Sequence, residues 1–390
     1  MFCQQVSRGS LSTLLFLEKG LMMKAEFNRT SLAEALSLVG SVVPTRTPKP
    51  ILRCIRLAAG KDEARVSATD LEVGISCVIG EVAVQQEGEA IVPADRLSAV
   101  VRESTDDVLA IEADADKCQV RGADSHFTIY TQPAAQYPPI ADFDGQADLE
   151  ISLQALQRAI TQCLFATAKE STRYALNGVL WEIKGKKLSL VATDGRRLAR
   201  VRANLASAAS DKIAAAKIIV PAKTMSLLGR IGAAEKDVAA AKLVDNQILI
   251  SCNGVVVSST LVEGNFPKYE EIIPTDYDKK LTLPTEATAS AVRRAALLTS
   301  EESRGVRLAL NKGKLVFSGR AAEAGDAEVE MNIDYAGEPM EIGFNPAFIT
   351  EALRVMDAEQ FELELGSADR PGLLKCGGNF LYVLMPINLG

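Results

Sequence analysis

The residue types that usually perform catalysis or bind metals are sparse in this chain. A single histidine, His126, occurs among 390 residues, so a Ser/His/Asp triad has one possible centre and a His-rich metal site is excluded. His126 lies in the alternating segment SHFTIYT, which is typical of an ordinary strand. The seven cysteines are scattered without a CxxC pair. They predict neither a disulfide framework nor a zinc site, and they fit a reduced cytoplasm.

An aspartate in the segment ATDG is the remaining candidate for hydrolytic chemistry. Asp194 has no histidine or second carboxylate in its own motif, and the same ATD triplet occurs 124 residues earlier with Asp70. A repeated aspartate indicates a structural turn that was duplicated together with its surroundings. The sequence therefore predicts no catalytic residue, no cofactor and no metal ligand, and an enzyme is the weakest of three function classes considered.

Composition and charge exclude further classes. A net charge of -7 argues against a generally basic nucleic-acid binder, although it says nothing about one face. No apolar run reaches about 18 residues, so we expect no membrane span. Residues 1–22 contain a short, interrupted apolar stretch without a small-residue cleavage site. We interpret them as an extension, disordered or from a misassigned start, and expect the folded part to open at Met23.

Internal repetition organises the rest of the chain. The segments IVPADRLSAVVRES, IVPAKTMSLLGRIG and GFNPAFITEALRVM each place a short apolar strand before a proline and an amphipathic helix after it. The prolines, Pro93, Pro221 and Pro346, follow one another at intervals of 128 and 125 residues. Such a period indicates three copies of one unit.

A second helix recurs at the same interval, in SLAEALSLVG, SLQALQRAITQCL and EATASAVRRAALL. In the first of these, Ser31 and Glu34 have the spacing of a capping box. Strand-like runs such as KLSLVATDGRRLARV lie between the two helices of each copy. We predict an α+β fold of three domains, over residues 23–146, 147–277 and 278–390, each with two helices packed on antiparallel sheet.

The helices of the three copies carry many basic residues: Arg96, Arg102, Arg158, Lys223, Arg230, Arg293, Arg294 and Arg354. Acidic residues are mixed among them: Glu34, Asp95, Glu103 and Glu351. Two interpretations remain open from composition, namely a solvated face and a surface for a polyanion.

Five strings carry a resemblance to a known family. In order along the chain, they are RYALNGVLWE, VATDGRRLA, FPKYEEIIP, SRGVRLAL and YVLMPINL. Together they resemble the bacterial DNA polymerase III beta subunit family, the sliding clamps, and the resemblance runs from Met23 to Leu389. It implies a non-catalytic, head-to-tail homodimer that forms a ring around duplex DNA. It also implies that the ring tethers the replicative polymerase, the clamp loader and repair polymerases, which bind through linear motifs, in the cytoplasm and without a membrane.

The resemblance further implies a hydrophobic cleft for partner peptides between the second and third domains. Its positions here are Leu176, Thr193, Gly195, Arg196, Arg197, Leu198, Pro267, Ile272, Val383, Met385, Pro386, Ile387 and Leu389. We expect the terminal strand to pair into the third sheet and its exposed side to line this cleft. Gly195 would permit a tight turn, and the stem of Arg197 would flank the apolar pocket.

For DNA contact, the resemblance points to Arg46, Arg173 and Tyr174, and the repeated helices add Arg158, Lys223, Arg230 and Arg294. Non-specific contacts of this kind hold phosphates without reading bases. A structural ion pair for Arg173 and a plain loop role for Arg46 stay open. For the dimer interface, the resemblance points to four apolar residues whose alternative is interior packing: Phe127, Ile129, Leu297 and Leu298.

Several positions depart from the family pattern. The tail has Ile387 and Asn388 where the family commonly has Met and Arg, and Gly390 is added after Leu389. Glu270 and Glu271 stand where arginines are frequent in the family, so the rim of the cleft carries negative instead of positive charge here. A second class of function stays open beside the clamp, namely a peptide-binding scaffold that uses the cleft alone and does not encircle DNA.

Overall fold

The computed structural model describes residues 23–169, 174–299 and 305–388. The predicted extension 1–22 lies outside these residues. The chain divides into two compact units, one formed by Met1–Gly145 with Leu249–Ser259 and one by Gln146–Ile248 with Thr260–Gly390. Within the described residues, no helix has both the length and the apolar character needed to cross a membrane.

The first described strand of the first unit is β1 (Met23–Asn28). Its five-stranded sheet has the order β5-β1-β7-β8-β9. The other four strands are β5 (Val82–Gln86), β7 (Val108–Ala113), β8 (Lys117–Arg121) and β9 (His126–Tyr130). Phe27 of β1 is fully buried, and β9 lies at the end of the order, as an edge strand.

The second sheet of this unit contains β2 (Cys54–Ala59), β3 (Ala64–Thr69), β4 (Val73–Ile79) and β6 (Gly88–Pro93). It also includes the hairpin of β16 (Gln247–Cys252) and β17 (Val255–Thr260), through the residues Leu249–Ser259. β17 pairs antiparallel with β4. The first unit therefore recruits a hairpin from far along the chain, which local pattern alone did not reveal.

Two helices of the first unit, α1 (Arg29–Gly40) and α2 (Ala94–Glu103), contact each other, as expected for the first repeat. The predicted capping box at Ser31 was wrong. The cap of α1 is Asn28, whose side chain accepts a hydrogen bond from the Ser31 backbone N–H at 3.0 Å. The helix therefore begins one residue after Asn28, and Ser31 lies inside its first turn.

The second unit is built on an eight-stranded sheet with the order β14-β11-β12-β13-β25-β24-β23-β18. Four strands come from the second copy: β11 (Gly178–Lys184), β12 (Lys187–Thr193), β13 (Arg197–Asn204) and β14 (Lys217–Pro221). Four come from the third: β18 (Lys279–Pro284), β23 (Gln360–Leu365), β24 (Gly372–Cys376) and β25 (Phe380–Leu384). The copies are joined where β13 pairs with β25, with Leu198 opposite Val383. The predicted pairing of the terminal strand into the third sheet is confirmed by its ladder with β24.

Six further strands lie in the part of the chain that belongs to this unit. β10 (Leu149–Ser152) pairs with β15 (Val238–Val244). A four-stranded sheet has the order β21-β20-β19-β22, formed by β19 (Val306–Asn311), β20 (Lys314–Ala321), β21 (Gly325–Asn332) and β22 (Met340–Phe344). The helices are α3 (Leu153–Leu164), α4 (Ala222–Leu228), α5 (Thr285–Ala295) and α6 (Pro346–Arg354). The described 3-10 turns are η2 (Pro50–Arg53), η3 (Ala134–Gln136), η4 (Tyr174–Asn177), η5 (Tyr269–Glu271) and η6 (Ala296–Leu298).

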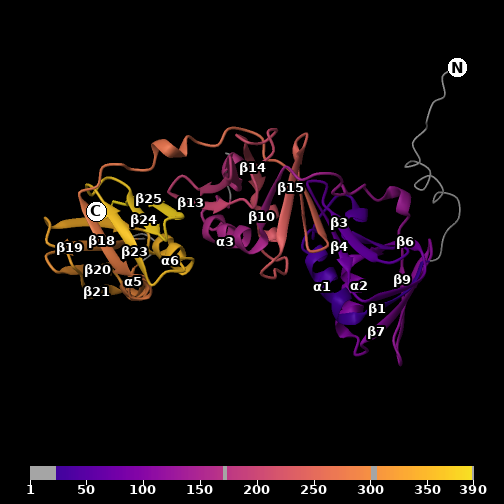
Figure 1. The fold of residues 1–390 in the computed structure, drawn as a ribbon. Helices are drawn as coiled ribbons and strands as arrows, with labels where there is room; N and C mark the ends of the chain where they lie inside the picture. The colour runs from indigo at the N-terminus through magenta and orange to yellow at the C-terminus, as the bar shows by residue number, and fades with distance from the viewer. Residues whose placement is uncertain (1–22, 170–173, 300–304, 389–390) are drawn as a thin grey trace, which may run out of the picture. The chain divides into compact units, whose positions relative to one another are not determined.

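Helices α3 and α6 cover the same face of the eight-stranded sheet (Figure 1). Ala199 and Tyr382 are register partners, so their side chains point to one face. The thiol of Cys163 in α3 lies 3.7 Å from the Ala199 carbonyl oxygen, and the Tyr382 hydroxyl donates to the Phe348 carbonyl of α6 at 3.1 Å. We call this side the helix face and the opposite side the outer face.

Candidate functional site

The two ATD segments form the same turn. Asp194 Oδ1 accepts hydrogen bonds from the backbone N–H groups of Arg196 and Arg197, at 2.9 and 3.1 Å. Asp70 Oδ1 accepts the same pair of bonds, at 3.0 and 2.7 Å, from the second and third residues after it. Both carboxylates therefore hold a turn between two strands, and the predicted structural role is confirmed.

The residue after each aspartate has a left-handed backbone. Gly195 has φ of 87°, which confirms the tight turn expected there. Its counterpart in the first copy is Leu71, with φ of 83°. A side chain at such an angle carries strain that glycine avoids.

The outer face of the eight-stranded sheet carries a cluster of apolar residues. Its buried members are Ala175, Leu180, Val191, Leu198, Ile219, Tyr269, Leu373, Leu381 and Val383, and the partly buried Val262, Phe266, Ile273 and Tyr277 pack against them. We call these residues the outer-face cluster. The partly buried ones all come from the segment between β17 and β18, which contains FPKYEEIIP. This segment therefore lies over strands of both the second and the third copy.

The predicted cleft residues separate into a buried floor and an exposed rim. The buried ones are Leu176, Thr193, Leu198 and Val383. Among the exposed ones, Ile272 and Met385 have 39% and 38% of their surface accessible. The expectation of an exposed side on the terminal strand was wrong, because all five residues of β25 are buried. Exposure begins only at Met385, one residue after the strand.

The tail beyond β25 is held by backbone hydrogen bonds. The N–H of Met385 donates to the Arg196 carbonyl at 3.0 Å, and that of Ile387 donates to the Gly343 carbonyl at 2.8 Å. Pro386 and Ile387 line a hollow of 500 Å³. Pro267 is partly exposed, and Leu389 lies outside the described residues.

Arg197 lies elsewhere than we expected. Its side chain is 7% exposed and extends from the helix face, not toward the outer-face cluster. The guanidinium lies 4.2 Å from the ring centroid of Phe348 and 5.4 Å from that of Phe165. It pairs with Asp194 at 3.0 Å and also with Glu351 of α6. Alternation along β13 explains the difference, since Leu198 occupies the outer face and its neighbour must occupy the other.

A buried carboxylate fastens the FPKYEEIIP segment to the sheet. The Tyr269 hydroxyl donates to Glu182 Oε2 at 2.6 Å, and Glu182 Oε1 lies 2.9 Å from Lys217 Nζ and 3.0 Å from Lys184 Nζ. Burial alone would raise the pKa of Glu182, but the hydrogen bonds from Tyr269 and the two lysines outweigh it and lower this pKa to about 2. Glu182 therefore stays charged and keeps Tyr269 in the cluster. Our sequence reasoning missed it, although a glutamate inside the apolar run VLWEIK was a usable signal.

The basic residues predicted for DNA contact lie largely on exposed surface. Arg158, Lys223, Arg230 and Arg294 are exposed, on or directly after α3, α4 and α5, and Arg46 is exposed in a loop of the first unit. Arg158 lies 3.3 Å from Asp357 Oδ2, so part of its charge is already compensated. Arg173 lies outside the described residues, and of Tyr174 only the backbone is described, at the start of η4.

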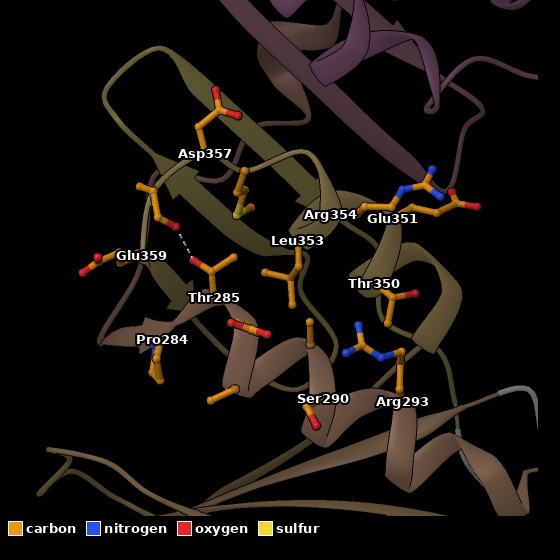
Figure 2. Close-up of a pocket in the computed structure, with 15 residues that line it drawn as sticks. Pro284, Thr285, Ser290, Arg293, Thr350, Glu351, Leu353, Arg354, Asp357 and Glu359 are labelled. Carbon is orange, nitrogen blue, oxygen red and sulfur yellow. Dashed lines mark hydrogen bonds between the residues drawn. The ribbon is translucent and has the colours of Figure 1, made fainter.

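The helix face of the third copy has mixed charge. Helices α5 and α6 enclose a pocket of 1080 Å³, and Figure 2 shows Arg293 pointing from α5 toward α6. Arg293 and Arg354 line this pocket together with four carboxylates, those of Glu286, Glu351, Asp357 and Glu359. A polyanion would therefore meet alternating charges here, not a uniform cationic surface.

The residues predicted for the dimer interface differ in exposure. Phe127 of β9 is 39% exposed and Leu297 of η6 is 77% exposed. Leu298 is partly buried. Ile129 is only 8% exposed, so it packs mainly inside its own sheet. Phe127 and Leu297 therefore carry most of the apolar surface that a second copy could cover.

The described residues contain no group of three or more His, Cys, Asp or Glu side chains suited to a metal ion. What the fold presents is a pair of chemically different surfaces: helices with exposed basic residues on one face of a continuous sheet, and an apolar cluster with an exposed rim on the other. This is the organisation of a three-domain clamp, with helices and antiparallel sheet repeated along the chain.

Three family models match the chain, for the N-terminal, central and C-terminal domains of the DNA polymerase III beta subunit, over residues 23–141, 150–268 and 270–388. The chain therefore belongs to the DNA polymerase III beta subunit family, the sliding clamps. This family is the non-catalytic processivity subunit of DNA polymerase III. Our predicted domain boundaries stay predictions, since the sheets cross from one repeat to the next.

Individual relatives agree with this assignment. The chain is 32% identical over 373 residues to the beta sliding clamp of Pseudomonas putida, which covers 94% of this chain and 100% of the relative. It is 31% identical to that of Vibrio cholerae, with the same coverage. The crystal structure of the DNA polymerase III subunit beta from Pseudomonas aeruginosa aligns with a TM-score of 0.86 at 31% identity, over 94% of this chain and 100% of that one.

Proposed function

We propose that this protein encircles duplex DNA as a head-to-tail homodimer and tethers the replicative polymerase to its template. It acts in the cytoplasm, and the clamp loader and repair polymerases bind it through short linear motifs. The single observation that carries the proposal is the eight-stranded sheet of the second unit, with basic helices on one face and the outer-face cluster on the other. The two activities thus use opposite sides of one sheet.

Exposed apolar side chains beside a buried apolar cluster support the docking of a peptide on the outer face. Met385 and Ile272 are exposed apolar side chains beside a buried apolar floor. A flexible methionine adapts to differing partner side chains. An extended peptide can therefore bury its own apolar residues against this rim.

Diffuse attraction to phosphates is supported by exposed Arg158, Lys223 and Arg294 on the helix face. Such contacts tolerate sliding because they do not read bases. The carboxylates between α5 and α6 limit how tightly the third copy holds DNA, which favours enclosure over adhesion as the source of retention.

Retention of the protein on closed circular DNA tests directly whether it encircles the duplex. A protein held by six to ten phosphate contacts loses about 10³ to 10⁵ in affinity between about 50 and 200 mM salt. A closed ring leaves circular DNA only by opening. We expect the protein, once loaded on nicked circular DNA by a bacterial clamp loader, to survive a high-salt wash and to dissociate after the circle is cut. Equal retention on circular and linear DNA would reject encirclement.

A charge-neutralised variant separates this function from a scaffold that does not encircle DNA. Replacing Arg158, Lys223 and Arg294 together by glutamine should reduce loading on DNA and leave peptide binding unchanged. The matched control replaces three exposed lysines away from these helices and from the peptide cleft, Lys61, Lys186 and Lys312. If both triple variants load equally well, the helix face is not the DNA-binding surface.

A further inference from the structure

One arginine on the outer face was not among the predicted site residues. Arg200 follows Leu198 by two positions on β13, so both side chains point to the outer face. Its register partners are Val191 of β12 and Leu381 of β25, and both belong to the outer-face cluster. A cationic side chain therefore lies between apolar residues of the outer-face cluster.

The guanidinium of Arg200 lacks the partners that usually accompany a partly buried charge. Its Nε is buried and has no hydrogen-bond partner among the described residues. Within that part of the chain, no carboxylate lies within 4.0 Å of it either, whereas Arg197 on the other face has two. Burial and the neighbouring Arg202 lower the pKa of Arg200. The arginine thus carries a positive charge without a close ion pair in a partly desolvated place, where Glu182 and Glu270 attract it only from a longer distance.

The nearby carboxylates are already engaged elsewhere. Glu182 is held by Lys184, Lys217 and Tyr269. Glu270 lies 3.4 Å from Lys217. The positive charge of Arg200 is therefore left for a group from outside the chain.

We propose that Arg200 is a specificity-determining residue of the peptide cleft and binds a carboxylate of the docked peptide, beside the apolar side chains that fill the outer-face cluster. This inference rests on the proposed function of the outer face as a peptide site. The guanidinium then attracts an acidic peptide although Glu270 and Glu271 are exposed carboxylates at the rim. The carboxylate comes from an aspartate or glutamate side chain or from the peptide's terminus, and the planar guanidinium suits both.

Four synthetic peptides test the assignment. The first peptide is an acetylated, amidated heptapeptide that contains two leucines, one phenylalanine and one aspartate. The second peptide has asparagine in place of the aspartate. The third and fourth are the same two sequences with free carboxyl termini. Affinities are measured by fluorescence anisotropy for the native protein, Arg200→Gln, Arg200→Lys and the control Arg202→Gln, which changes an exposed arginine on the same face of β13.

For the native protein, we expect a carboxylate to increase affinity by about 10-fold or more, the usual gain from a charge-assisted hydrogen bond. The gain should disappear in Arg200→Gln, persist in part in Arg200→Lys and persist in Arg202→Gln. A gain for the aspartate peptides identifies a side-chain carboxylate, and a gain only for free termini identifies the terminal one. A similar gain in native protein and Arg200→Gln overturns the assignment.

Two results separate this inference from the proposed function. If all four peptides bind the native protein equally, the cleft stands and the role of Arg200 is rejected. If none binds, the cleft itself is rejected, and the inference with it. Should Arg200→Gln fail to fold, the Arg200 Nε–H resonance of the native protein decides, since the aspartate peptide must shift it more than the asparagine peptide does.

Discussion

Single residues in this chain show how a duplicated motif diverges. The first and second copies keep the aspartate that caps the turn between two strands, yet the following residue is Leu71 in one copy and Gly195 in the other. Both have a left-handed backbone. Leu71 is 49% exposed, so its side chain recovers little of the strain by burial. Local stability was therefore not optimised at this turn.

We expect Leu71→Gly to stabilise the first unit by about 0.5–1 kcal/mol, because glycine relieves the left-handed strain at a smaller entropic cost. The reciprocal change, Gly195→Leu, should destabilise the second unit by about 1 kcal/mol. No heavy atom lies within 4 Å of a Cβ built on Gly195, so the penalty is conformational. Urea denaturation of both variants measures the effects. The two substitutions must change the free energy of unfolding in opposite directions. If Leu71→Gly were less stable than the native protein, the left-handed backbone at Leu71 would not be a source of strain.

Glu182 gives a prediction for pH. Its pKa falls from 4.5 to about 2 in the folded protein, so its stabilising contribution is complete above pH 4.5 and is lost as the pH falls toward 2. We expect the native protein to lose about 2 kcal/mol more than Glu182→Gln between about pH 5 and 3. Equilibrium unfolding at the two pH values measures this difference. Glu271→Gln, at an exposed carboxylate, should behave like the native protein.

At the scale of elements, the joint between β13 and β25 turns two repeats into one sheet. Arg197, the first residue of β13, stabilises this joint on the helix face, where its guanidinium contacts Glu351 and Phe348 of α6. Glu182 and Tyr269 act on the outer face, where they hold the connecting segment down. The peptide cleft proposed above therefore depends on contacts from both sides of one sheet.

Removing the guanidinium should loosen this joint. We expect Arg197→Met to destabilise the second unit by about 2–3 kcal/mol, because it leaves Asp194 and Glu351 without their partner and removes two cation–π contacts. Hydrogen exchange should rise most at the amides of α6. Arg196→Met, at the exposed neighbour, is the matched control. If the α6 amides of Arg197→Met exchanged as slowly as those of the native protein, the pairing of β13 with β25 would hold the two repeats together without Arg197.

At the scale of the whole molecule, assembly depends on surfaces that a single copy leaves uncovered. β9 is the edge of its sheet and carries Phe127 and the 78% exposed Tyr130, while Leu297 projects from η6. Exposed apolar side chains of this size favour association when a matching surface exists. The proposed ring therefore uses these residues at its subunit boundary.

Placing a charge at Leu297 tests that boundary. We expect Leu297→Asp to sediment as a monomer at micromolar concentration, because a carboxylate would be desolvated in the interface. The control is Val238→Asp, at a 44% exposed aliphatic residue of β15, which should remain dimeric. A dimer for Leu297→Asp at the lowest concentration measured by analytical ultracentrifugation would exclude this residue from the interface.

The sequence by itself determined the repeat, the two helices per copy, the Asx turns at Asp70 and Asp194, and the family. These features depend on local spacing and on hydrogen bonds within a few residues, so they can be found without a partner strand. Asn28 shows the limit, because its capping bond displaced the Ser31 box that the spacing had suggested.

Only the tertiary structure decided which repeats share a sheet and which side chain faces which way. The pairing of β13 with β25 joins residues 179 to 187 positions apart, and no local pattern encodes such a partner. Once that register is set, the two-residue period of the strand sends Leu198 and Arg200 to the outer face and Arg197 to the helix face. A shift of one residue would exchange them, which is why the side of Arg197 and the role of Arg200 could be seen only in the folded chain.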